Sequence, residues 1–190
     1  MHNNPYYRNV TAFNSATRTK RLSRTAYAAL AALLLITAVG CDRGDHPERV
    51  SKPAPLFTIS DGVQKIDLAK LRGRVVVLNL WATWCAPCLV ELPSLLELQR
   101  RMPELAIVGI ALDQSDDVYR RFLVQHHVQI TTVRDADGRI NSLYGTQLLP
   151  ETYIIDKDGL LRRKLINAQD WTSPEIMGYL RKLAEARGSS

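Results

Sequence analysis

The chain has 190 residues, enough for one domain and an N-terminal leader. Its formal charge of +6 is unevenly placed, because residues 1–40 hold five basic and no acidic residues, whereas residues 41–190 hold 20 basic and 19 acidic residues. The main part of the chain is therefore nearly neutral, and its charge gives no indication of a nucleic-acid partner.

The N-terminal segment has the pattern of an export signal. A basic cluster, Arg18–Arg24, precedes the apolar stretch Ala26–Val39. That stretch is shorter than the roughly 20 apolar residues that cross a bilayer, and a short apolar region after basic residues is typical of a signal peptide. Residues 1–40 are therefore predicted to be a lipoprotein-type signal segment that directs the rest of the chain out of the cytoplasm.

Cys41 follows the small residues Ala38-Val39-Gly40, a pattern that resembles the cleavage box of bacterial lipoproteins. The resemblance implies that Cys41 becomes a lipidated N-terminus at the periplasmic face of the inner membrane, since Asp42 resembles the residue that retains enteric lipoproteins there. Two alternatives stay open: Cys41 ends an uncleaved anchor helix, or ordinary signal cleavage occurs nearby. All three place the domain outside the cytoplasm.

Residues 41–55 carry charges, a glycine and three prolines, which is typical of a linker. They are predicted to be a tether to a folded domain over residues 56–187. That domain opens with two short strands, 56–59 and 64–67, and a brief helical turn over residues 68–71. The continuous apolar run 74–81 then predicts a central strand covered on both faces.

The run Trp84-Cys85-Ala86-Pro87-Cys88 follows that strand, and helical periodicity continues to Met102. Two cysteines three residues apart at the start of a helix can close a small disulfide and open it again. Because helix N-termini favour negative charge, Cys85 is expected to be an exposed nucleophile with a pKa below the usual value of about 8.5. Cys88, one turn further on and more buried, is expected to resolve the mixed disulfide.

Other uses of two cysteines fit this sequence less well. Structural zinc needs four ligands, and the sequence has no second pair of cysteines at this spacing. An inert disulfide that closes so small a loop would stabilise the fold little. Two-coordinate copper(I) binding stays open, although no Met, His or further Cys lies near the motif.

Strands and helices alternate over the remainder of the chain. The predicted elements are a buried strand at 105–112, a helix at 115–127, a short strand or extended loop at 129–133, a short helix at 138–144, paired strands at 151–156 and 160–166, and a helix at 173–187. This order predicts an α/β fold with three layers, and the closing hairpin makes its sheet mixed.

Several segments together resemble the thioredoxin fold and, within it, the membrane-anchored TlpA/ResA/CcmG-type thiol–disulfide oxidoreductases. The matching segments are residues 53–57, 71–88, 89–93 and 149–156. The resemblance extends over residues 53–187. It implies a thioredoxin-like three-layer sandwich in which helices flank a mixed central sheet, with an extra N-terminal β-hairpin.

The resemblance also implies which residues meet the substrate. Pro150 would be a cis-proline beside the disulfide, and the backbone of Leu149 would pair with an extended substrate segment. Trp84 would shield the cysteines or contact the substrate. Glu151 would shape the pocket or the substrate groove.

A second set of implied roles concerns the proton. Asn79 stands where cytoplasmic thioredoxin has a buried aspartate, and an asparagine cannot titrate. Glu91, three residues past Cys88, therefore becomes the better proton acceptor. Burial near the redox pair would raise its pKa, and it would move the proton of Cys88 or tune Cys85.

The function implied by the resemblance is reduction of disulfides in exported proteins, without a bound cofactor or metal. The implied substrates are the haem-site cysteines of apocytochrome c or copper-site cysteines in oxidase assembly. A membrane electron donor of the DsbD/CcdA type would have to regenerate the dithiol, because the compartment is kept oxidising. Two alternatives stay open: an oxidant that donates its disulfide, and a copper(I)- or peptide-binding lipoprotein without redox turnover.

Overall fold

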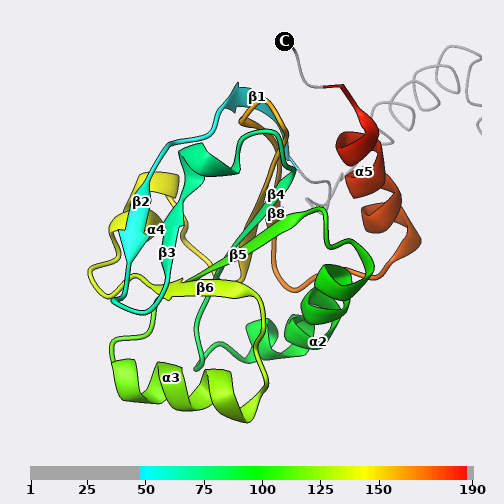
Figure 1. Cartoon of the computed structure of the whole chain (residues 1–190). Coiled ribbons are helices and arrows are strands. Elements are labelled where there is room, and N and C mark those ends of the chain that lie inside the picture. The colour runs from blue at the N-terminus through cyan, green and yellow to red at the C-terminus, as the bar shows by residue number, and fades with distance from the viewer. Residues whose placement is uncertain (1–47, 188–190) are drawn as a thin grey trace, which may run out of the picture. The chain divides into compact units, whose positions relative to one another are not determined.

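A computed structural model describes residues 48–187 of the chain (Figure 1). The predicted signal segment, Cys41 and the first part of the predicted tether lie outside the described residues. The elements predicted between residues 56 and 187 are all present, with small shifts at their ends. The ambiguous segment at 129–133 proves to contain a strand, over residues 131–134.

The middle layer is a six-stranded mixed sheet with the order β1-β8-β7-β4-β5-β6. Its strands are β1 (Glu48–Pro53), β4 (Val76–Trp81), β5 (Ala106–Ala111), β6 (Thr131–Arg134), β7 (Glu151–Ile155) and β8 (Leu160–Ile166). Strand β4 pairs in parallel with β5 and antiparallel with β7. Every residue of β4 is buried, as its continuous apolar run predicts.

Helices α2 (Ala86–Arg101), α3 (Asp116–Gln125) and α5 (Pro174–Glu185) cover one face of this sheet. The other face carries the hairpin of β2 (Thr58–Ser60) and β3 (Lys65–Asp67), the 3-10 helix η1 (Leu68–Leu71), and α4 (Arg139–Tyr144). Figure 1 shows the hairpin and α4 together on one side, and α2 and α5 on the other.

Alternation along β4 explains how one strand serves both faces. Val77 packs in a cluster with Leu95 of α2 and Leu180 of α5, whereas Leu78 packs in the cluster that contains Ile66 and Ile140. Successive side chains of a strand point to opposite faces, so the residues of β4 face the two outer layers in turn. The predicted thioredoxin-like three-layer sandwich is confirmed.

The predicted tether is too long at its C-terminal end. Residues 48–53 form β1, which pairs antiparallel with β8 at the edge of the sheet and contains an irregularity between Arg49 and Lys52. An edge strand accommodates Pro53, because one side of its backbone needs no partner. Residues 51–53 are exposed, so they show no alternation of buried and exposed positions that a sequence pattern could reveal.

Candidate active site

The first cysteine lies where the sequence places it, at the start of α2. Cys85 is the N-cap, the helix begins at Ala86, and Pro87 occupies the first turn. The backbone N–H of Cys88 donates to the sulfur of Cys85 at 3.2 Å. Proline costs nothing in the first turn, where its missing N–H would be unpaired. The Cys88 N–H, which has no partner within the helix, thus donates to the Cys85 sulfur, the atom that would carry negative charge.

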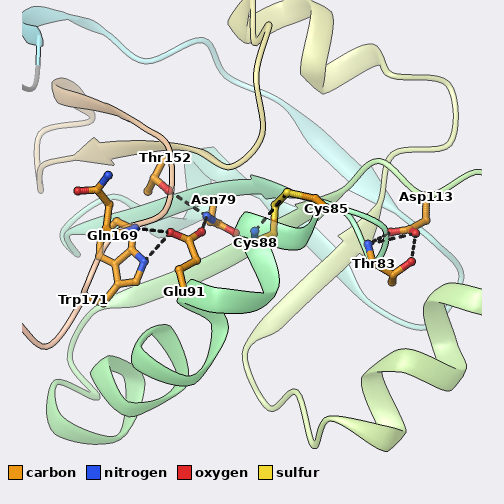
Figure 2. Close-up of a disulfide and its surroundings, with 9 residues drawn as sticks. All are labelled: Asn79, Thr83, Cys85, Cys88, Glu91, Asp113, Thr152, Gln169 and Trp171. Atoms are coloured by element: carbon orange, nitrogen blue, oxygen red, sulfur yellow. Dashed lines mark hydrogen bonds between the residues drawn. A yellow bond between two sulfur atoms is a disulfide. The ribbon is translucent and has the colours of Figure 1, made fainter. Parts of the chain in front are cut away.

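Cys85 and Cys88 are joined by a disulfide with an S–S distance of 2.05 Å (Figure 2). Both residues are buried, at 5% and 3% exposure. The expectation that Cys85 is exposed is thus wrong for the disulfide state. Its sulfur is bonded to Cys88, and both cysteines belong to an apolar cluster with Trp81 and Leu92. Trp84, directly before the pair, is 67% exposed.

A buried acidic residue that belongs to no sequence motif holds the connection between β4 and α2. Asp113 follows β5 and is 2% exposed. Its carboxylate accepts hydrogen bonds from the backbone N–H of Thr83 at 3.1 and 3.2 Å and from the Thr83 hydroxyl at 2.5 Å. The available signal is its place just past the carboxyl end of a parallel strand, where α/β proteins gather functional groups.

Glu91 lies on α2, one helical turn beyond Cys88, and is 2% exposed. Asn79 donates to its Oε1 at 2.8 Å, and the Gln169 backbone N–H and the Trp171 indole each donate to its Oε2 at 3.1 Å. These three hydrogen bonds favour the carboxylate. Burial outweighs them and raises the pKa of Glu91 above its usual value, as predicted.

Asn79 links Glu91 to the neighbouring strand. Its amide also donates to the hydroxyl of Thr152 at 2.9 Å, and the two residues are direct partners in the pairing of β4 with β7. In the view of Figure 2, the Asn79 side chain lies between the Glu91 carboxyl group and the disulfide. Among the side chains that these hydrogen bonds connect, that of Glu91 is the one that can gain or lose a proton.

Gln169 and Trp171 join this network from the segment that follows β8. They lie 78 and 80 residues after Glu91 in the chain. Trp171 is fully buried and packs in the core beside α2 and α5. No sequence pattern connects positions so far apart, so these two donors could not be predicted from the sequence.

The peptide bond between Leu149 and Pro150 is cis, as the resemblance implies. Pro150 is buried, and Leu149 packs against the cluster that contains both cysteines. The structure therefore brings the expected substrate-pairing segment next to the redox pair. Its role in binding substrate stays a prediction.

Glu151 lies on the opposite face of the sheet from Glu91. It is 1% exposed, pairs with the Lys164 ammonium group at 2.9 Å and accepts a hydrogen bond from the Thr146 hydroxyl at 3.1 Å. Adjacent strand residues point to opposite faces, and the next residue, Thr152, belongs to the Glu91 network. Glu151 therefore points to the other face of the sheet, where it anchors the segment before Pro150.

Within residues 48–187, no group of three or more His, Cys, Asp or Glu side chains is arranged to hold a metal ion. In the same range, no helix is both long enough and apolar enough to cross a bilayer.

Comparison with known proteins assigns the chain to a family. The profile described as the AhpC/TSA family matches residues 50–164. The chain belongs to the AhpC/TSA family.

Relatives of this AhpC/TSA-family protein are named for thiol–disulfide chemistry. It is 36% identical to the thiol-disulfide oxidoreductase ResA of Bacillus thuringiensis over 138 residues, 71% of this chain and 79% of the relative. It is 30% identical to the thiol:disulfide interchange protein DsbE of Pseudomonas aeruginosa over 148 residues, 74% of this chain and 80% of the relative. The protein is a thiol–disulfide oxidoreductase of the ResA and DsbE type.

A solved structure supports the same assignment. It is that of a secreted Mycobacterium tuberculosis disulfide oxidoreductase, described as homologous to Escherichia coli DsbE. The two proteins are 28% identical with a TM-score of 0.59, over 67% of this chain and 96% of the other. The AhpC/TSA-family chain thus shares its domain, and the sheet that positions the cysteines, with a protein of the same chemistry.

Proposed function

We propose that the protein is an extracytoplasmic reductase that transfers two electrons from a Cys85–Cys88 dithiol to disulfides in exported proteins. The observation that carries this proposal is the cysteine pair at the N-terminus of α2, where the Cys88 N–H faces the Cys85 sulfur. The names of the relatives, which describe thiol–disulfide exchange, support it.

The reaction proceeds in two exchanges. The Cys85 thiolate attacks one sulfur of the substrate disulfide, whose S–S bond breaks, and the departing thiolate takes up a proton. Cys88 then gives its proton to the Glu91 carboxylate and attacks the Cys85 sulfur in the mixed disulfide. This second step releases the other substrate thiolate, which takes up the proton that Glu91 received from Cys88, and leaves the Cys85–Cys88 disulfide. The substrate gains two electrons and two protons.

Glu91 favours the reducing direction. A negative charge one helical turn beyond Cys88 opposes a thiolate on the pair, and so does the apolar cluster around both cysteines. A dithiol whose thiolate is less stabilised is a stronger reductant. The alternative, a disulfide donor, needs a strongly stabilised thiolate.

Substrate contact is assigned to Trp84, Leu149 and Pro150. Trp84 is exposed directly before the pair, and Leu149 packs against the cysteine cluster. An extended substrate segment would pair with the Leu149 backbone and rest against Trp84. Glu151 is not included, because it is buried in an ion pair with Lys164.

The proposed location is the periplasmic face of the cytoplasmic membrane, with Cys41 as the lipidated anchor and a dithiol carrier of the DsbD/CcdA type as the electron donor. The export pattern of residues 1–40 supports this location, as does the description of a relative as secreted. The proposed substrates are the haem-site cysteines of apocytochrome c or copper-site cysteines in oxidase assembly.

The redox potential tests the direction. The chain without residues 1–41 would be equilibrated in defined thiol buffers, and the fractions of dithiol and disulfide measured. A potential near or below the roughly −270 mV of thioredoxin is expected. A potential near the roughly −120 mV of a strong oxidant would overturn the proposal.

Trapping in cells tests the roles of the two cysteines. Cys88→Ser leaves the attacking thiol without its resolving partner, so mixed disulfides with exported proteins should accumulate. They would be detected on non-reducing gels and disappear on reduction. Cys85→Ser is the matched control and should trap nothing. Equal trapping by the two variants would contradict the assignment of Cys85 as the nucleophile.

A further inference from the structure

We propose that Asp113 is a positioning residue for the redox pair. By binding Thr83 it holds the segment that leads into α2, keeps Cys85 at the helix N-cap, and so sets the redox potential of the pair. This inference rests on the proposed function in taking Cys85 as the attacking thiol. Asp113 itself touches neither cysteine in any hydrogen bond among the described residues.

All the hydrogen bonds that the Asp113 carboxylate accepts within residues 48–187 come from Thr83. Both oxygens bind the Thr83 backbone N–H, and Oδ1 also binds its hydroxyl. A carboxylate that is 2% exposed has lost most of its hydration, and hydrogen bonds to a charged acceptor are stronger than those between neutral groups. The pair of side chains, called here the Asp113–Thr83 clasp, is therefore a strong local restraint.

The backbone around Asp113 is itself fixed. Leu112 donates to the carbonyl of Trp81 at 2.9 Å, which continues the pairing of β5 with β4. Arg134 at the end of β6 donates to the carbonyls of Asp113 at 3.4 Å and Gln114 at 3.1 Å. Asp113 thus follows a paired strand directly and lies between backbone groups that are hydrogen-bonded, so it can restrain a neighbouring loop.

The loop in question is the short connection between β4 and α2. Thr83 lies two residues before Cys85, and the Cys85 N–H donates to the carbonyl of Ala82 at 3.2 Å. Trp84 is largely exposed and so does not anchor the loop by burial. Figure 2 shows the clasp on the side of the disulfide away from Glu91. The clasp is accordingly a polar side-chain anchor of this connection, in addition to the burial of Ala82 and Cys85.

The position of Cys85 matters because its sulfur accepts the N–H of Cys88 at 3.2 Å. A thiolate accepts a stronger hydrogen bond than a disulfide sulfur does. Geometry that presents this N–H and the helix N-terminus to Cys85 therefore stabilises the reduced pair more than the disulfide. Loosening the clasp should reduce this extra stabilisation of the reduced pair. The disulfide should then be harder to reduce, and Cys85 should be less reactive.

The negative charge of Asp113 would act in the opposite direction. A charge near the pair disfavours the thiolate, so removing the charge alone should make the disulfide easier to reduce. Positioning and charge therefore predict shifts of opposite sign. This difference allows an experiment to separate them.

Four variants of the full chain separate the two effects. Asp113→Ala removes all three contacts, and Thr83→Ala removes the hydroxyl contact while keeping the charge. Asp113→Asn keeps an oxygen acceptor without the charge, and Thr83→Ser keeps the hydroxyl. Each variant would be equilibrated with reduced and oxidised glutathione, and the alkylation rate of the reduced form by iodoacetamide would be measured at pH 7.

The equilibrium constant for reduction by glutathione should fall in both alanine variants, on the order of tenfold for Asp113→Ala, which corresponds to a potential about 30 mV more negative. Alkylation of Cys85 should slow in the same two variants. For Thr83→Ser, both the equilibrium constant and the alkylation rate should remain close to the wild-type values. The equilibrium constant should fall less in Asp113→Asn than in Asp113→Ala.

Two results would overturn the inference. A lowered unfolding midpoint with unchanged potential and alkylation rate in both alanine variants would make the clasp merely structural. A disulfide that is easier to reduce in both Asp113 variants, with Thr83→Ala unchanged, would assign the effect to charge. If Asp113→Ala does not fold, Thr83→Ala against Thr83→Ser still decides. A wild-type protein that fails to exchange with glutathione would instead count against the proposed function.

Discussion

Glu91 is the residue on which burial and hydrogen bonding act in opposite directions. Three donors face its two oxygens, yet desolvation prevails and raises its pKa. When Glu91 takes up a proton, one oxygen must donate instead of accept. Asn79 can meet this change by rotating its amide, because its other partner, the Thr152 hydroxyl, both donates and accepts. The network is therefore suited to hold either protonation state.

Glu91→Gln should change how stability depends on pH. Between the ordinary Glu value of about 4.5 and the raised folded pKa, the folded wild type holds a proton that the unfolded chain has lost. Wild-type stability should thus fall as pH rises through this window, with a slope of up to about 1.4 kcal/mol per pH unit. Glu91→Gln should lack this slope in urea unfolding between pH 4.5 and 8. Parallel curves for the two proteins would contradict the assignment.

The same variant should change the reactivity of the cysteines. Without a carboxylate near Cys88, thiolates form more easily, so the pH profile for thiol alkylation of the reduced protein should move to lower pH. The wild-type profile measured in the same buffers is the reference. An unchanged profile would remove Glu91 from the proton transfer.

Among the elements, α4 shows how a helix that starts at glycine is stabilised. Its N-cap, Gly138, has φ of 63° and no side chain to bind the free N–H groups. Asp135, buried at the end of β6, accepts the N–H groups of Arg139, Ile140 and Asn141 instead. The helix leads into the segment that carries Leu149 and Pro150, so this cap also supports the substrate side of the site.

Asp135→Ala should lower the free energy of unfolding by about 1–3 kcal/mol, because three N–H groups at the helix start lose a charged acceptor. Asp137→Ala is the matched control. Asp137 lies in the same turn and is exposed, so its loss should cost less than about 0.5 kcal/mol. Urea unfolding of both variants measures the difference. Equal losses would show that the charge of the turn matters rather than the cap.

For the molecule as a whole, the start of β1 limits how far the domain can stand from an anchor. If Cys41 is lipidated, residues 42–47 connect it to the sheet, and a fully extended chain of that length spans about 20 Å. The domain would then work close to the bilayer, within reach of a membrane electron donor and of substrates at the same surface.

Cys41→Ser should therefore release the protein from membranes into the soluble fraction, because a serine cannot take the lipid. Fractionation of cells followed by immunoblotting measures the change. Cys85→Ser, which also removes one cysteine, is the control and should stay with the membrane. Continued pelleting of Cys41→Ser would indicate an uncleaved anchor helix.

Much of this architecture follows from local pattern. The order of strands and helices, the central strand β4, the placement of Cys85 at a helix start and the burial of Glu91 all derive from hydrophobic periodicity and short spacings or from resemblance in short segments. The edge strand β1 escapes such reasoning. Its residues 51–53 are exposed, and it is held by backbone pairing with β8, more than 100 residues away in the chain.

The sequence by itself determined the α/β class, the redox pair and the kind of reaction, because these depend on residues near one another in the chain. Only the tertiary structure decided that Cys85 is buried as a disulfide, that Asp113 clasps Thr83, that Trp171 donates to Glu91, and that Glu151 points to the opposite face. Those contacts depend on strand order and register, which bring distant segments together and which no local pattern encodes.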